Sequence, residues 1–177
     1  MDKNLLSHYG KAIFEYSKDN KNIEKTKKDM DLVLDLLNEN PDFKKFLSSP
    51  TISFSIKKEK LNKVLSKEVD SSTLTFLNIM IKKNAFSNFK IVHQAFTHQY
   101  NDYNNILEGK LFTAFDLTKE KVSSIETLLS KKEKKKIVLS QINDPHIIGG
   151  IRIYLDNKIY DFSLERKVNK IKESLIK

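Results

Sequence analysis

The chain has 177 residues, of which 39% are hydrophobic, so it can fold as one domain or as two small ones. It contains no cysteine, which excludes disulfides and thiolate chemistry, and it has no run of about eighteen apolar residues that would predict a transmembrane helix. Because its start lacks the apolar stretch of a signal peptide, we expect the chain to stay in the cytosol of a bacterium.

The net charge of +9 favours nucleic acid or an anionic membrane surface as a partner. Only Arg152 and Arg166 among the 32 basic residues are arginines, although arginine suits bidentate contacts with bases and phosphates best. The basic residues are also spread over both halves of the chain, whereas nucleic-acid-binding proteins gather them on one face. A basic helical nucleic-acid-binding adaptor is therefore kept only as the alternative function.

The first part of the chain has the periodicity of amphipathic helices. Segments in which apolar residues recur every three to four positions are 5–16, 23–37 and 56–65. Asn40-Pro41 has the sequence of a helix start. The segment 72–83 is apolar nearly all round, which predicts a central helix in a bundle, and 87–107 is its expected partner.

Near Glu108-Gly109 the apolar period changes from that of a helix to that of a strand. The alternating segment 110–116 predicts a strand, Thr118 can begin a helix, and 137–142 predicts a second strand. We therefore predict a helical domain over residues 1–107 and an α/β domain over residues 108–177. The expected fold class is mostly α with a smaller α/β part.

The stretch 143–163 has the most specific pattern in the chain. Asp144-Pro145 predicts a turn, 151–155 is apolar and branched like a strand, and Asp156-Asn157 predicts a two-residue hairpin into another strand. Ser163 is a candidate helix N-cap. The apolar residues that follow it at spacings of four, three and four are Leu164, Val168, Ile171 and Leu175. That spacing places them on one face of a closing helix.

Gly149-Gly150 has two possible interpretations. Paired glycines beside a strand indicate a bulge or a close approach to another backbone segment. A phosphate-binding loop is the alternative, but it requires a third glycine or a Gly-Lys-Ser/Thr ending before a helix, and here a strand follows. We therefore favour the structural interpretation.

No catalytic, metal-binding or cofactor-binding motif is found. The four histidines stand outside any zinc-binding spacing, and no serine or threonine lies in a nucleophile elbow. His93 falls on the apolar seam of its helix, which favours a packed polar residue over a ligand. The charge run Lys131–Lys136 could contact an acidic partner or lipid head groups, although a solvated connection is the commoner role of such a run.

The stretch DPHIIGGIRIYLDNKIYDFS resembles the C-terminal signature of the delta subunit of F-type ATP synthases, called the oligomycin-sensitivity-conferring protein in mitochondria. The matching residues are Asp144, Pro145, Ile148, Gly149, Gly150, Ile159, Asp161 and Ser163. The segments SHYGKAIFE and FLSSPTIS also resemble this family. The chain departs from the family pattern at the Asp156-Asn157 hairpin and at Phe162, where glycine is usual.

The resemblance implies a non-catalytic stator subunit of a bacterial F-type ATP synthase. It implies an N-terminal six-helix bundle on the catalytic head, bound to the N-terminal segments of alpha subunits. It also implies a C-terminal domain, with a small sheet and two helices, that binds the b-subunit stalk. Such a protein holds the head still, so that proton flow drives ATP synthesis. It needs no cofactor, small-molecule substrate or nucleic acid, and it joins the cytoplasmic face of the cell membrane only through the complex.

The family's use of its first and fifth helices implies an alpha-subunit groove in this chain. The residues expected to line it are Tyr9, Ile13, Tyr16, Leu77 and Met80, and plain bundle core is the alternative for each. In the closing helix we expect Leu164 and Val168 to face the sheet. Ile171 and Leu175 are then expected to be available to the b-subunit tail.

Overall fold

The computed structural model describes residues 3–175. The chain divides into two compact units, Met1–Tyr100 and Asn101–Lys177. The first unit is helical and the second is built on a four-stranded sheet, in agreement with the predicted fold class. The predicted boundary after residue 107 falls inside the first strand, because the strand begins at Ile106, before the alternation that starts at Lys110.

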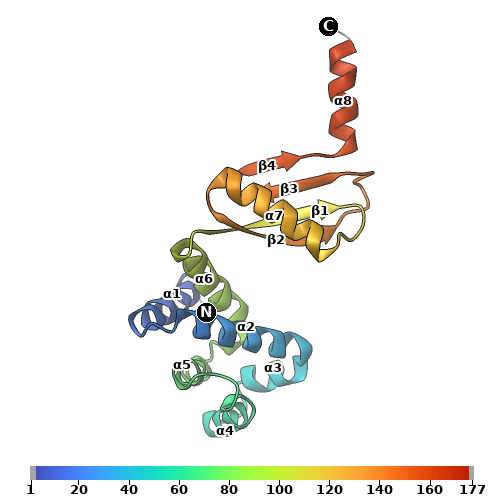
Figure 1. Cartoon of the computed structure of the whole chain (residues 1–177). Helices are drawn as coiled ribbons and strands as arrows, with labels where there is room; N and C mark the ends of the chain where they lie inside the picture. The colour runs from blue at the N-terminus through green and yellow to red at the C-terminus, as the bar shows by residue number, and fades with distance from the viewer. Residues whose placement is uncertain (1–2, 176–177) are drawn as a thin grey trace. The chain divides into compact units, whose positions relative to one another are not determined.

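The helices of the first unit follow one another with short connections (Figure 1). They are α1 (Lys3–Asp19), α2 (Ile23–Glu39), α3 (Pro41–Ser48), α4 (Phe54–Leu65), α5 (Ser71–Lys82), the 3-10 helix η1 (Phe86–Asn88) and α6 (Phe89–Tyr103), which runs past the end of the unit. Pro41 occupies the first turn of α3, as predicted, because a missing N–H costs nothing there.

One apolar core joins all the helices of the first unit. Its centre is aromatic: the Phe86 and Phe89 rings stack with centroids 5.7 Å apart, and Phe14 meets Phe96 edge-on at 6.0 Å. The buried residues of α5, at spacings of three and four, lie on one face of the helix: Thr73, Phe76, Leu77, Met80 and Ile81. Because Ile79 is 45% exposed, α5 is not buried on all sides, contrary to the prediction from its apolar sequence.

Helix α1 approaches α6 very closely at Gly10. A Cβ atom built on Gly10 would lie 2.5 Å from the carbonyl oxygen of Val92 and 2.6 Å from the Cβ of Ala95. Both distances are far below van der Waals contact, so only a glycine allows this helix spacing.

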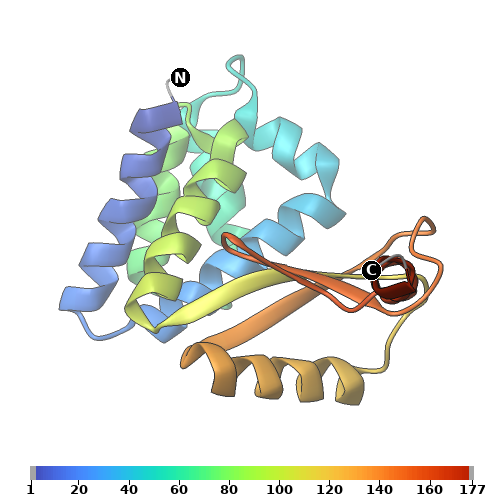
Figure 2. The same ribbon diagram turned by 90° about the horizontal axis from the view of Figure 1, so that it is seen from above.

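The second unit contains one mixed sheet. Its strands are β1 (Ile106–Thr113), β2 (Lys136–Asn143), β3 (Ile151–Leu155) and β4 (Lys158–Asp161), in the order β2-β1-β3-β4. Strands β1 and β2 are parallel, and α7 (Lys119–Glu133) provides the crossover between them. The other neighbours are antiparallel. Helix α7 covers one face of the sheet (Figure 2), where Leu129 packs with Leu111, Leu139 and Ile153.

The predicted hairpin and closing helix are both present. Asp156 adopts a left-handed conformation (φ 51°) between β3 and β4, which its residue type tolerates. Helix α8 (Leu164–Leu175) follows β4 and extends away from the sheet (Figure 1).

Candidate docking surfaces

A groove lies between α1 and α5 in the first unit. It has a volume of about 390 Å³. Its lining residues are Ala12, Ile13, Tyr16, Ser71, Ser72, Thr75, Phe76 and Ile79. Tyr16 and Ile79 are large side chains with 51% and 45% of their surface exposed. An apolar groove of this kind between two helices suits the apolar face of a third helix.

The start of α5 is held firmly beside this groove. The Asp70 carboxylate caps the helix by accepting the backbone N–H of Ser72 at 2.9 Å. Hydrogen bonds from Ser72 hold the pKa of Asp70 below its ordinary value. The backbone N–H of Asp70 donates to the buried carboxylate of Asp29 in α2 at 2.8 Å. These contacts fix the start of α5 against α2.

The structure separates the five residues predicted to line the alpha-subunit groove. Ile13 and Tyr16 line it, and Tyr9 is half-buried against the bundle core. Leu77 and Met80 are both 0% exposed in the core, so their assignment to the groove is corrected. The α5 residues that line the groove include Phe76 and Ile79, which directly precede the predicted Leu77 and Met80 in the sequence. Because the sequence of α5 is apolar at most positions, its pattern does not show which face of the helix is buried. Only the polar Ser71, Ser72 and Thr75 indicate the outer side.

The second surface is the apolar stripe of α8. Leu164, Val168 and Ile171 are 48%, 49% and 58% exposed. The prediction that Leu164 and Val168 face the sheet is therefore wrong for Val168 and holds only partly for Leu164, which lies against Gly149. The reason is that α8 projects from the end of the sheet instead of lying across it (Figure 1). The side chain of Leu175 lies outside the described residues.

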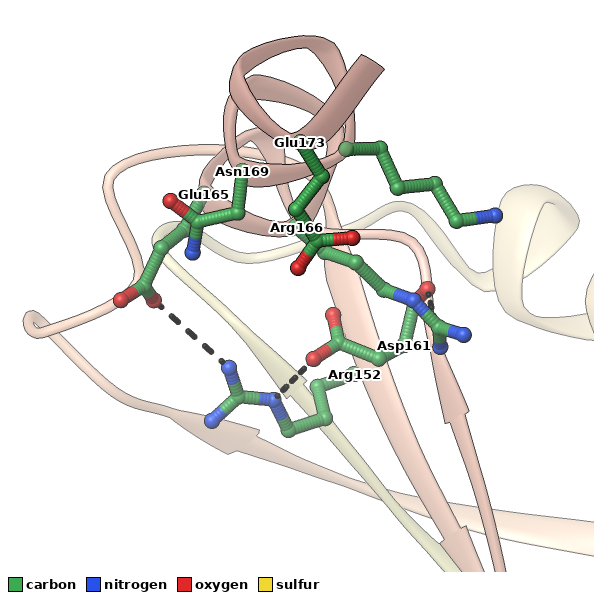
Figure 3. A pocket seen from close by; sticks show the side chains of 7 residues that line it. Arg152, Asp161, Glu165, Arg166, Asn169 and Glu173 are labelled. Carbon is green, nitrogen blue, oxygen red and sulfur yellow. Dashed lines mark hydrogen bonds and ion pairs between the residues drawn. The ribbon is translucent and has the colours of Figure 1, made fainter. Parts of the chain in front are cut away.

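A charged pocket of about 460 Å³ lies at the base of α8 (Figure 3). The Nε of Arg152 is 3.1 Å from the Asp161 carboxylate, and its Nη2 is 3.8 Å from the Glu165 carboxylate. The charge of Asp161 raises the pKa of Arg152. Arg166 donates to the backbone carbonyl of Asp161 at 3.3 Å. Both arginines of the chain therefore meet at this junction, which sequence reasoning did not detect.

The signature residues shape the turn that aims α8. The Asp161 carboxylate accepts the N–H of Ser163 at 2.9 Å, which holds the pKa of Asp161 below its ordinary value. The Ser163 hydroxyl accepts the N–H of Arg166 at 3.3 Å, as an N-cap does. Gly150 has φ of 83°, and a Cβ there would collide with the carbonyl oxygen of Phe162. The close backbone approach predicted for the paired glycines is confirmed.

Asp144 and Pro145 form the predicted turn after β2. The Asp144 carboxylate accepts the N–H of His146 at 3.0 Å, two residues further on. The backbone N–H of Asp144 donates to Thr113 in β1 at 2.8 Å. This turn leads the chain to Gly149, whose carbonyl accepts the N–H of Leu164 at 2.9 Å. The whole signature thus ties the end of β2 to the start of α8.

Neither surface resembles a catalytic or metal site. Within residues 3–175, no three His, Cys, Asp or Glu side chains are grouped so that they could hold a metal ion. Over the same range, no helix has the length and apolar character required to span a bilayer. The surfaces offer apolar side chains, ion pairs and helix faces, which suit protein partners.

The family model for the ATP synthase delta (OSCP) subunit matches residues 5–175. The chain belongs to this family. A protein of Lactobacillus johnsonii named ATP synthase subunit delta is 32% identical over 173 residues, which cover 97% of this chain and 94% of that protein. A protein of the same name from Clostridioides difficile is 27% identical over 172 residues, with 97% and 95% covered.

The fold agrees with this relationship. A chain in the cryo-EM structure of the Toxoplasma gondii mitochondrial ATP synthase hexamer superimposes with a TM-score of 0.73, covering 98% of both chains. Since the two are only 17% identical, this likeness shows the fold alone. Membership of the delta (OSCP) family confirms the predicted resemblance and the predicted role as a non-catalytic stator subunit of an ATP synthase.

Proposed function

We propose that the two surfaces are the two ends of a mechanical link. The α1–α5 groove binds the N-terminal helix of an alpha subunit, and α8 with the adjoining pocket binds the tail of the b subunits. The first unit then acts as a six-helix bundle on the catalytic head, and the second unit, residues 101–177, acts as the module that binds the peripheral stalk. The link operates at the cytoplasmic face of the bacterial membrane and couples proton flow to ATP synthesis.

The groove supports the first half of the proposal. Its walls come from α1 and α5, and its lining contains the exposed Tyr16 and Ile79 together with the buried Ile13 and Phe76. The polar residues Ser72 and Thr75 line the α5 side. An amphipathic helix that buries its apolar face in the groove would contact the apolar lining residues and, at its polar margin, the polar residues of α5.

The form of α8 supports the second half. Its apolar stripe is exposed while it is flanked by charged residues, so the helix resembles one member of a helix pair. The basic residues of α8 are Arg166, Lys167, Lys170 and Lys172, against the acidic Glu165 and Glu173. A stalk helix with an apolar stripe and an acidic flank matches this surface.

Binding titrations with full-length chain test both ends. Ile79→Asp should weaken binding of a peptide from the N-terminus of an alpha subunit about 10- to 100-fold, because burying one such side chain is worth about 1.5–3 kcal/mol. Ile56→Asp is the matched control, since Ile56 is also exposed but lies on α4, away from the groove. Normal peptide binding by Ile79→Asp would remove the groove from the proposal.

The stalk end is tested by Val168→Ala and Ile171→Ala. Each should weaken binding of a peptide from the tail of the b subunits about three- to tenfold and leave the thermal midpoint nearly unchanged, because both side chains are about half exposed. Ile148→Ala is the control, since Ile148 is exposed and outside α8. Unchanged peptide affinity in both α8 variants would show that the stalk docks elsewhere.

A further inference from the structure

Strand β2 is an edge strand with an apolar sequence. It lies at the end of the order β2-β1-β3-β4, so only one of its sides pairs with another strand. The backbone N–H of Lys136 donates to Asn105, and that of Asp144 donates to Thr113, both toward β1. Because a strand alternates, the N–H and C=O groups of Ile137, Leu139 and Gln141 point outward. Such an edge is a template for pairing with another strand.

Two of these outward N–H groups are occupied by side chains of α7. The N–H of Leu139 donates to the Glu126 carboxylate at 2.8 Å, and the N–H of Ile137 donates to the Ser130 hydroxyl at 3.0 Å. Both hydrogen bonds are partly buried. Glu126 and Ser130 are four positions apart and therefore lie on one face of α7. Helix α7 covers one face of the sheet, and these two side chains reach from it to the outward N–H groups of β2.

The remaining parts of the edge are also obstructed. The Gln141 side chain accepts the N–H of Leu117 at 3.3 Å and donates to the Asp116 carboxylate at 3.0 Å, which ties the segment before α7 to the end of β2. At the other end, Lys134, Lys135 and Lys136 lead directly into the strand. Lysines that flank an apolar strand oppose edge-to-edge association, which gives the charge run a role.

We propose that Glu126 and Ser130 are edge caps that prevent β2 from pairing with β2 of a second copy of the chain. Side-chain acceptors on neighbouring turns of one helix satisfy successive outward N–H groups of the strand. While the caps are in place, a second strand cannot reach those N–H groups. Without them, β2 offers free donors and acceptors beside the exposed side chain of Val138.

The expected product of uncapping has a defined geometry. Two identical edges related by a two-fold axis pair antiparallel, so that the sheets of two copies join into one continuous sheet. In such a pair the N–H groups of Ile137 and Leu139 are hydrogen-bonded again, now to the partner strand. Association elsewhere on the surface would leave these two amides exposed.

The test compares the full-length chain with Glu126→Ala, Ser130→Ala and the double variant, by amide hydrogen exchange and by light scattering over a range of concentrations. Each single variant should lose about fivefold of the exchange protection at its own amide, since a hydrogen bond is worth about 1 kcal/mol. The double variant should form dimers at high concentration and recover protection at both amides there. Glu126→Gln, which retains an acceptor oxygen, and Ser124→Ala, whose hydroxyl donates only within α7, should behave like wild type.

Three results would overturn the edge caps. The first is unchanged exchange at Ile137 and Leu139 in the alanine variants. The second is a double variant that exchanges faster but stays monomeric at every concentration. The third is association that leaves both amides unprotected. If the double variant does not fold, Glu126→Ala alone gives the same comparison at the amide of Leu139.

Discussion

The close contact between α1 and α6 makes Gly10→Ala a sharp test of the packing in the first unit. Two effects of this substitution oppose each other. Alanine favours a helix interior by about 1 kcal/mol over glycine, so helix propensity alone predicts a more stable protein. The added methyl group, however, would lie 2.5 Å from the carbonyl oxygen of Val92 and 2.8 Å from the backbone nitrogen of Phe96.

The steric effect should be the larger one. The atoms that would have to move are backbone atoms of α6, which is anchored in the core through Phe89, Val92 and Phe96. Overpacking of this kind costs about 1–3 kcal/mol or more, and here the overlap is close to 1 Å with rigid backbone. We therefore expect a net destabilisation of about 1–2 kcal/mol. For a unit of about 100 residues this lowers the thermal midpoint by about 4–16 °C.

Thermal unfolding of full-length chain, followed by helical circular dichroism, measures this shift. Ala12→Gly is a useful companion, because Ala12 is exposed on the same helix and its loss of about 1 kcal/mol reports helix propensity alone. A higher midpoint for Gly10→Ala than for wild type would mean that propensity dominates and that α1 and α6 are less closely packed than the structure shows.

Two further predictions concern single positions. Gly150→Ala should destabilise the second unit by about 2–4 kcal/mol, because alanine is strained at φ of 83° and its Cβ collides with Phe162; a denaturation midpoint equal to wild type would contradict this. For Asp31, partial burial raises the pKa, but hydrogen bonds from His93 and Lys27 outweigh this and hold the pKa below its ordinary value. The resulting stability is present above about pH 4 and is lost as the pH falls through the lowered pKa, so Asp31→Asn should cost about 0.5–1 kcal/mol at pH 7 and progressively less as the pH falls below about 4. A pH-independent difference in unfolding free energy would refute this assignment.

Local signals in the sequence predicted most elements. Asn40-Pro41 at the start of α3, Asp156 in the hairpin and Ser163 before α8 each have a residue type whose backbone preference determines the local conformation. The paired glycines were also interpreted correctly from the chemistry of a missing side chain. The local conformations at these positions are determined by residues that are adjacent in the sequence, so they can be predicted from the sequence alone.

Contacts between distant segments could not be predicted in the same way. Leu77 and Ile79 are both apolar residues of α5, and only the packing against other helices decides that Leu77 is buried and Ile79 exposed. The stripe of α8 was correctly predicted, but an amphipathic pattern does not identify the surface that will cover it. Arg152 and Arg166 are fourteen positions apart and meet at Asp161 because the hairpin and the turn bring them together.

The central claim is that this non-catalytic chain couples rotor motion to ATP synthesis by joining the catalytic head to the stalk. The most direct measurement is proton-driven ATP synthesis by membrane vesicles from cells that lack the chain, with ATP hydrolysis measured in parallel. We expect synthesis to be lost while hydrolysis by the head persists, and synthesis to return when purified full-length chain is added. Full coupled synthesis in vesicles that lack the chain would contradict the claim.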